Sequence, residues 1–269
     1  MSTLKDALKK GVIYYKDELN DDFNEVGLSR PSVPEGYKYK RTNPISNVFA
    51  NILYYGLGVP IMWIACKFHG IKVVNKKYLR RFRHKSGAFI YANHVSISDA
   101  WKYHAYVCLP KRVNIIGYSD ALSLPGIVRY LVRCFGLLPL PLKTDLSNQR
   151  PFREAVEWYV NDQKQFVLIF PEAHIWPYYT KIRNFLPNSF IYPVKAQAPV
   201  IPMVTVWRKS KLRKKPRQTV VIGKPIYPDP SLDDKESVLE LHERCLNQMK
   251  YIADSYMQYN YIRYIKKEE

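Results

Sequence analysis

The spacing of hydrophobic and polar positions divides the chain into three regions. Residues 1–24 place apolar side chains along one side of a helix and lysines elsewhere, which predicts a basic amphipathic helix that either lies on a membrane or covers a core. Residues 25–46 carry several prolines and are predicted to be an extended linker. We therefore divide the chain into an N-terminal helix and linker at 1–45, a membrane-associating segment at 46–68 and an α/β domain at 69–269.

The membrane-associating segment contains the longest apolar run, from Val48 to Cys66, which has no charged residue. Its length is near the lower limit of about 20 residues for a membrane-spanning helix. Gly56, Gly58 and Pro60 interrupt the run and favour a broken helical hairpin that dips into one leaflet. A helix buried in the protein core is the alternative. Lysines and arginines flank the run on both sides, which favours the cytoplasmic face of the cell membrane.

The remainder of the chain alternates short apolar strands with helices. Strands are expected at 70–74, 87–91, 112–118, 165–170, 199–207 and 219–223, and helices at 98–109, 122–135, 153–161 and 233–256. Two prolines confine the segment 136–142 to a sheet edge or a loop. The alternation predicts an α/β layer fold.

The clearest candidate for chemistry is His94, which follows the strand at 87–91, together with Asp99, which opens the next helix. In open α/β sheets, ligands bind in the crevice at the carboxyl ends of the strands. A histidine there can take a proton from a hydroxyl, and a carboxylate that holds one ring nitrogen fixes its tautomer. The substrate hydroxyl would then be the nucleophile. The alternative is that His94 is a buried, hydrogen-bonded turn residue.

A second acid, Glu172, follows the strand at 165–170 within the sequence Phe170-Pro171-Glu172. If that strand is parallel to the strand before His94, the carboxylate reaches the same crevice and accepts hydrogen bonds from substrate hydroxyls. Glu172 could equally be a capping or surface acid.

The net charge of +19 implies an anionic partner: nucleic acid, an anionic membrane surface or a phosphorylated substrate. A solvated basic surface is the simpler alternative.

The four cysteines are widely spaced in apolar surroundings. This pattern indicates reduced cysteines that pack in the core, favours a cytoplasmic location and argues against a zinc site. The first residues are polar and contain lysines, unlike a secretory signal peptide.

Four motifs in order resemble those of one family, the glycerolipid acyltransferases of the 1-acylglycerol-3-phosphate type, also called lysophospholipid acyltransferases. They lie at 93–99 (Asn-His-Val-Ser-Ile-Ser-Asp), 136–143 (Gly-Leu-Leu-Pro-Leu-Pro-Leu-Lys), 170–172 (Phe-Pro-Glu) and 198–204 (Ala-Pro-Val-Ile-Pro-Met-Val). The apolar segment with basic flanks also resembles the membrane-binding helices of that family. The resemblance covers roughly residues 46–225.

The resemblance implies a mixed central sheet flanked by helices, and membrane-associated transfer of a fatty acyl group. By it, His94 is the general base, Asp99 orients His94, and Glu172 helps to bind the glycerol part of the acceptor. The implied partners are acyl-CoA or acyl-carrier protein, a lysophospholipid acceptor such as 1-acylglycerol-3-phosphate, and an anionic membrane surface, with no nucleic acid. Backbone N–H groups would stabilise the oxyanion. No metal and no organic cofactor is implied.

The sequence departs from the family pattern after Phe-Pro-Glu, where Ala173-His174-Ile175 replaces the usual Gly-Thr/Ser-Arg. An arginine expected to contact phosphate is thus missing, and His174 either contacts the substrate or packs. The candidates to replace the arginine are Lys143, Arg150, Arg153, Lys181 and Arg183. Two other functions stay open: a non-catalytic basic protein that binds membranes or nucleic acid, and an acyltransferase with a non-glycerolipid acceptor.

Overall fold

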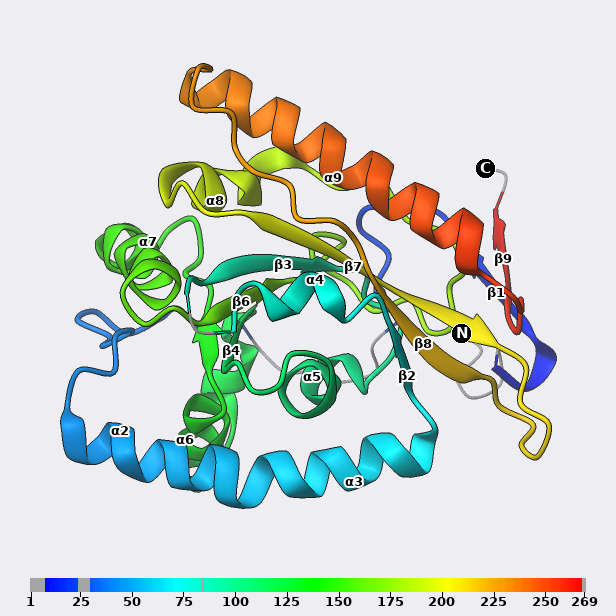
Figure 1. The fold of residues 1–269 in the computed structure, drawn as a ribbon, viewed down its shortest axis with the longest axis horizontal. Helices are drawn as coiled ribbons and strands as arrows, with labels where there is room; N and C mark the ends of the chain where they lie inside the picture. The colour runs from blue at the N-terminus through cyan, green and yellow to red at the C-terminus, as the bar shows by residue number, and fades with distance from the viewer. Residues whose placement is uncertain (1–7, 24–29, 84, 268–269) are drawn as a thin grey trace.

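The computed structural model describes residues 8–23, 30–83 and 85–267. Within them, seven strands form one sheet in the order β2-β8-β7-β3-β6-β4-β5 (Figure 1). Neighbouring strands are parallel except for the antiparallel pair β7–β8, so the predicted α/β fold with a mixed sheet is confirmed. The strands are β2 (Lys72–Val74), β3 (Ala88–Ala92), β4 (Val113–Gly117), β5 (Leu137–Pro139), β6 (Phe166–Ile169), β7 (Val200–Arg208) and β8 (Arg217–Ile222).

Helices cover both faces of this sheet, and the central strand β3 is therefore buried along its whole length. Phe89 and Tyr91 face a core formed with α7, α8 and α9, whereas Ala88 and Ile90 face a second core on the opposite side. The elements are α4 (Lys77–Arg80), α5 (Asp99–Lys102), η2 (Tyr103–Val107), η3 (Ser119–Ser123), α6 (Gly126–Cys134), α7 (Leu146–Asn161), η4 (Pro187–Phe190), α8 (Ile191–Lys195) and α9 (Asp234–Tyr256). All four cysteines are buried and free.

The apolar segment forms one continuous helix from Pro44 to His69, so the predicted broken hairpin is wrong. It consists of α2 (Pro44–Asn51), the π-helical stretch η1 (Ile52–Gly58) and α3 (Val59–His69), and it runs lengthwise along the domain in Figure 1. Pro60 is the second residue of α3, directly after the π-helical stretch, where the first turn of the α-helix does not need its backbone N–H. Gly58 serves close packing, because a Cβ there would lie 2.0 Å from the Phe135 ring.

The N-terminal region also differs from the prediction. Residues 1–7 lie outside the described part, and Val12–Tyr15 forms the strand β1 in place of the predicted amphipathic helix over 1–24. This strand pairs in parallel with β9 (Arg263–Lys266), which the sequence pattern did not predict. Tyr15 and Tyr264 pack on Trp176, at ring-centroid distances of 4.8 and 5.0 Å. The two chain ends thus cover the loop that follows β6.

Candidate active site

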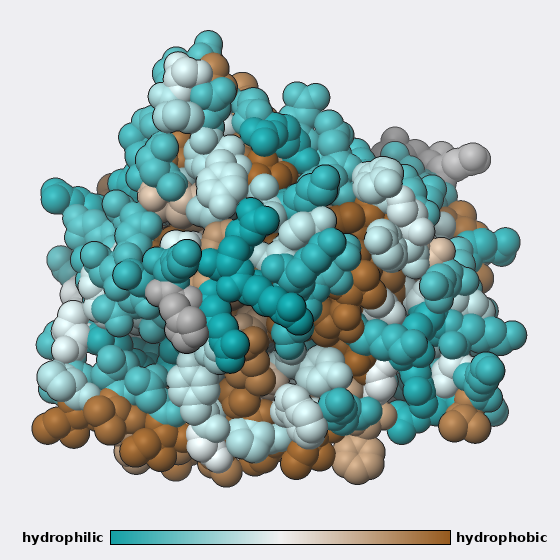
Figure 2. Space-filling model, viewed as in Figure 1, coloured by the Kyte–Doolittle hydropathy of each residue, from teal (hydrophilic) through white to brown (hydrophobic). Residues whose placement is uncertain are grey.

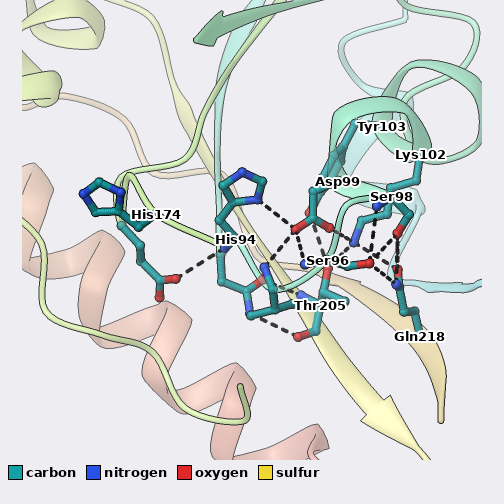
Figure 3. Close-up of polar contacts among 12 residues, drawn as sticks. His94, Ser96, Ser98, Asp99, Lys102, Tyr103, His174, Thr205 and Gln218 are labelled. Carbon is teal, nitrogen blue, oxygen red and sulfur yellow. Dashed lines mark hydrogen bonds and ion pairs between the residues drawn. The ribbon is translucent and has the colours of Figure 1, made fainter. Parts of the chain in front are cut away.

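The strands β3 and β6 are parallel neighbours, and their carboxyl ends place His94 and Asp99 beside the loop after β6. The imidazole Nδ1 of His94 lies 3.0 Å from Asp99 Oδ2 (Figure 3). The same oxygen accepts the backbone N–H groups of Val95 and Ser96, at 2.8 and 2.9 Å. The turn between strand and helix therefore wraps around the carboxylate and holds it against the imidazole.

Asp99 is completely buried, and its second oxygen accepts a hydrogen bond from Lys102, one helical turn further along α5. Lys102 is buried as well and also donates to Thr205 Oγ1 and to Gln218 Oε1, at 2.6 and 3.1 Å. Burial alone would raise the pKa of Asp99, but Lys102 and His94 outweigh it and hold that pKa below its ordinary value. The sequence analysis missed Lys102, although the spacing of three residues from Asp99 on a helix was a usable signal.

The ring of His94 stacks on Phe170, with centroids 4.1 Å apart and planes inclined by 12°. Since an ionised carboxylate can only accept, the hydrogen bond to Asp99 places the proton of neutral His94 on Nδ1. Nε2 is then unprotonated and can accept a proton. His94 forms part of the wall of a cavity of about 830 Å³, so its free nitrogen has room for a substrate.

Glu172 lines the same cavity, is 4% exposed and is paired with Arg183. Its Oε2 accepts the backbone N–H of His94 at 3.3 Å, and its Oε1 accepts that of Arg183 at 3.0 Å. Glu172 therefore ties the loop after β6 to the loop that carries the imidazole. Burial raises the pKa of this carboxyl, and the contacts with Arg183 oppose the rise.

The two residues after Glu172 stand where this chain departs from the family pattern. Ala173 has a φ of 62°, a left-handed conformation that costs a residue with a Cβ about 1 kcal/mol and that glycine adopts freely. His174 lies in the cavity wall, with Nδ1 3.1 Å from Asp22 Oδ2. In Figure 3 its ring is on the opposite side of His94 from Asp99.

Most of the cavity wall is apolar, with polar groups around His94 and His174. The apolar wall comes from the ends of β4, β5 and β6, from α6 and from the segment 185–192: Ile115, Ile116, Val132, Phe135, Leu137, Leu140, Ile169, Phe185, Leu186 and Tyr192. This shape suits a ligand with a long apolar part and a small polar part. No group of three or more His, Cys, Asp or Glu in the described part of the chain is arranged to hold a metal ion.

The structure brings His94, Asp99, Glu172 and Arg183 together but leaves the other predicted substrate-binding residues outside the cavity. Lys143, Arg150, Arg153 and Lys181 are exposed and do not line it. The predicted phosphate contact of Arg183 does not fit its position, because the side chain is 1% exposed and its guanidinium bonds Glu172 and the carbonyls of Glu18 and His174. Among the described residues, Arg30 is the one lysine or arginine that lines the cavity, and the sequence analysis missed it.

The site thus combines a mixed α/β sheet with an imidazole–carboxylate pair beside a largely apolar cavity. The Acyltransferase family model matches residues 70–206, just over half of the chain, and the chain belongs to this family. No curated protein matches it. A solved structure titled as the 1-acyl-sn-glycerophosphate (LPA) acyltransferase PlsC from Thermotoga maritima is similar, with a TM-score of 0.50 and 18% identity over 78% of this chain and 93% of that chain. At that identity the likeness shows a shared fold.

Proposed function

We propose that the protein transfers a fatty acyl group from the thioester of acyl-CoA or acyl-carrier protein to a hydroxyl of a glycerol-based lysolipid. The supporting observation is the His94–Asp99 pair: the imidazole of His94 lines the cavity, and its Nδ1 is occupied by the buried carboxylate of Asp99. The family match supports the acyl-transfer chemistry. The largely apolar cavity supports a lipid substrate.

In the proposed reaction, His94 Nε2 takes the proton of the acceptor hydroxyl as its oxygen forms a bond to the thioester carbonyl carbon. Asp99, which Lys102 holds in its ionised form, stabilises the imidazolium that results. The tetrahedral intermediate then collapses, the carbon–sulfur bond breaks, and the imidazolium returns the proton to the departing thiolate. No nucleophilic side chain of the protein is required.

This function predicts that the purified full-length chain, in detergent micelles, releases thiol from a long-chain acyl-CoA or acyl-carrier protein only when a lysolipid is present. The thiol can be followed with a chromogenic reagent and the acylated lipid by mass spectrometry. Thiol release without an acylated lipid would show a thioesterase instead. If neither acyl-CoA nor acyl-carrier protein releases thiol in the presence of a lysolipid, the proposal is wrong.

We also propose that the helix from Pro44 to His69 lies in the plane of the membrane surface. By length and composition it is the one helix in the described residues that could cross a membrane. However, Tyr54 and Cys66 on one side are fully buried against the domain, and Tyr54 OH lies 3.1 Å from His104 Nδ1. The opposite side is exposed and apolar: Ile45, Val48, Phe49, Ile52, Leu57, Ile61, Ile64 and Phe68. Figure 2 shows this apolar band along the lower edge of the molecule.

A helix packed on the domain by one side and apolar on the other fits an in-plane anchor better than a span. The short helix α6 extends the same surface, because Tyr130 contacts Phe49 at a ring-centroid distance of 6.4 Å. The cytoplasmic location of this membrane face stays a prediction from the basic flanks of the helix.

The in-plane anchor predicts that Ile61→Glu combined with Ile64→Glu lowers binding to anionic lipid vesicles by about 100-fold or more, because two exposed isoleucines no longer enter the lipid. Cosedimentation with vesicles measures the change. Tyr251→Glu is the matched control, since Tyr251 is exposed on α9, on the side of the domain away from the anchor in Figure 1. Unchanged binding of the double variant would contradict the anchor.

A further inference from the structure

The polar part of the active-site cavity carries more negative than positive side chains. Among the described residues that line it, the carboxylates are Asp22, Asp120 and Glu172, whereas Arg30 is the one lysine or arginine. Glu172 is neutralised by its buried partner Arg183. The remaining wall thus has two carboxylates, one guanidinium and three histidines: His94, His104 and His174. Burial lowers the pKa of His104 to about 3, and His174 lies beside Asp22.

The single guanidinium is already engaged. The guanidinium carbon of Arg30 lies 3.6 Å from the centroid of the Tyr118 ring, a cation–π contact. Asp22 faces His174 in the same cavity wall, and Asp120 lies in the first turn of the short helix η3, two residues after Tyr118. A phosphate monoester placed among these groups would meet net repulsion, since its own charge approaches −2 at neutral pH.

Besides the histidines, the wall carries uncharged donors and acceptors, among them Asn20, Tyr118, Asn184, Asn188 and Ser189. Amide and hydroxyl groups of this kind hydrogen-bond free hydroxyls without requiring a charge on the ligand. Together with the apolar wall, they match a molecule with a fatty chain and an uncharged polyol end.

We propose that the acyl acceptor is an uncharged lipid alcohol of the monoacylglycerol type and not a phosphate monoester. This inference rests on the proposed acyl transfer and narrows its acceptor. It departs from the 1-acylglycerol-3-phosphate expected from the family resemblance. The basic residues predicted to bind phosphate agree with this proposal, because four of them are exposed outside the cavity and the guanidinium of Arg183 is buried: Lys143, Arg150, Arg153 and Lys181 are the exposed ones.

The test compares two acceptors with the same acyl chain, monoacylglycerol and lysophosphatidic acid, at equal mole fraction in neutral detergent micelles with one acyl donor. We expect kcat/KM to favour monoacylglycerol by about tenfold or more. Equal use of the two acceptors, or a preference for lysophosphatidic acid, would overturn the inference and leave acyl transfer intact. Transfer to neither acceptor, nor to other lysolipids, would instead overturn the proposed function.

A charge change in the wall provides the second measurement. Asp120→Lys is expected to shift the ratio of kcat/KM for the two acceptors toward lysophosphatidic acid by about tenfold. Asp120→Asn removes the charge but retains an acceptor for the N–H of Ala121, and it should shift this ratio by about threefold. Asp254→Lys is the matched control, because Asp254 is exposed on α9 and does not line the cavity. If both Asp120 variants fold, as judged by thermal denaturation, but leave the ratio unchanged, the inference is wrong.

Discussion

Replacing His94 with alanine is expected to lower kcat for acyl transfer by about 10³-fold, because general-base catalysis by a positioned side chain contributes roughly 10²- to 10⁴-fold. The thioester and the acceptor still bind, since the change leaves the apolar wall of the cavity intact. The loss should therefore fall on kcat, with KM changed little. Steady-state kinetics with a saturating acyl donor and a varied acceptor separate the two parameters.

The same variant should remain folded. Without the imidazole, the carboxylate of Asp99 keeps the N–H groups of Val95 and Ser96 and the ammonium of Lys102, so no buried charge is left alone. We expect a stability loss of about 1 kcal/mol from the lost hydrogen bond and stacking. His69→Gln is the matched control, because this exposed histidine lies outside the cavity. Wild-type turnover in His94→Ala would remove His94 from the mechanism.

The sequence was sufficient for the parts of the fold that depend on local pattern. Short apolar runs bounded by charged or turn residues located six strands of the main sheet. For 136–142 the two prolines left a sheet edge or a loop open, and the edge strand β5 is found there. The spacing from His94 to Asp99 was also interpretable, because the turn between β3 and α5 brings residues five apart into contact.

Features that depend on contacts between distant segments were not predictable in this way. β1 and β9 lie at opposite ends of the chain, and each is too short to be recognised without its partner. The glycines of the apolar helix suggested a break, whereas Gly58 provides space for Phe135 from a remote element. The polar wall of the cavity is likewise assembled from distant parts of the chain that no local motif connects: Asn20, Asp22, Arg30, Tyr118, Asp120, Asn184, Asn188 and Ser189.

The lysines and arginines predicted to bind phosphate show the same limit of sequence analysis. Lys143 was chosen because it ends the second motif and Arg150 because it lies shortly after it, yet both side chains are exposed. Arg150 pairs with Glu154 within α7 at 2.7 Å. Arg183 was chosen because it follows Phe-Pro-Glu, and it does reach Glu172. A sequence pattern could suggest that proximity but not that the guanidinium is enclosed, which requires Trp176 and the N-terminal segment to pack around it.

The enclosed pair makes the second strong prediction, which concerns stability. Arg183→Met keeps an unbranched side chain beside Trp176 but leaves the buried carboxylate of Glu172 without its counter-charge. Removing one partner of a buried ion pair typically costs about 3–5 kcal/mol of the free energy of unfolding. We expect a loss of this size in urea denaturation at pH 8. If Arg183 acted by packing alone, the loss would be smaller and independent of pH.

The pH dependence follows from the direction of the pKa shift. Burial raises the pKa of Glu172 in the folded protein above its pKa in the unfolded chain, so the folded state binds this proton more tightly. The free energy of unfolding therefore falls as pH rises from the unfolded-state pKa to the folded-state pKa. Without Arg183 the folded pKa rises further, so the interval widens upward. The loss of stability caused by Arg183→Met should therefore be smaller at pH 5 than at pH 8.

Adding Glu172→Gln to Arg183→Met removes the charge but keeps an oxygen to accept the N–H of His94, and it should recover much of the loss at pH 8. Equal losses at both pH values, with no recovery in the double variant, would show that the charge of Glu172 does not depend on Arg183.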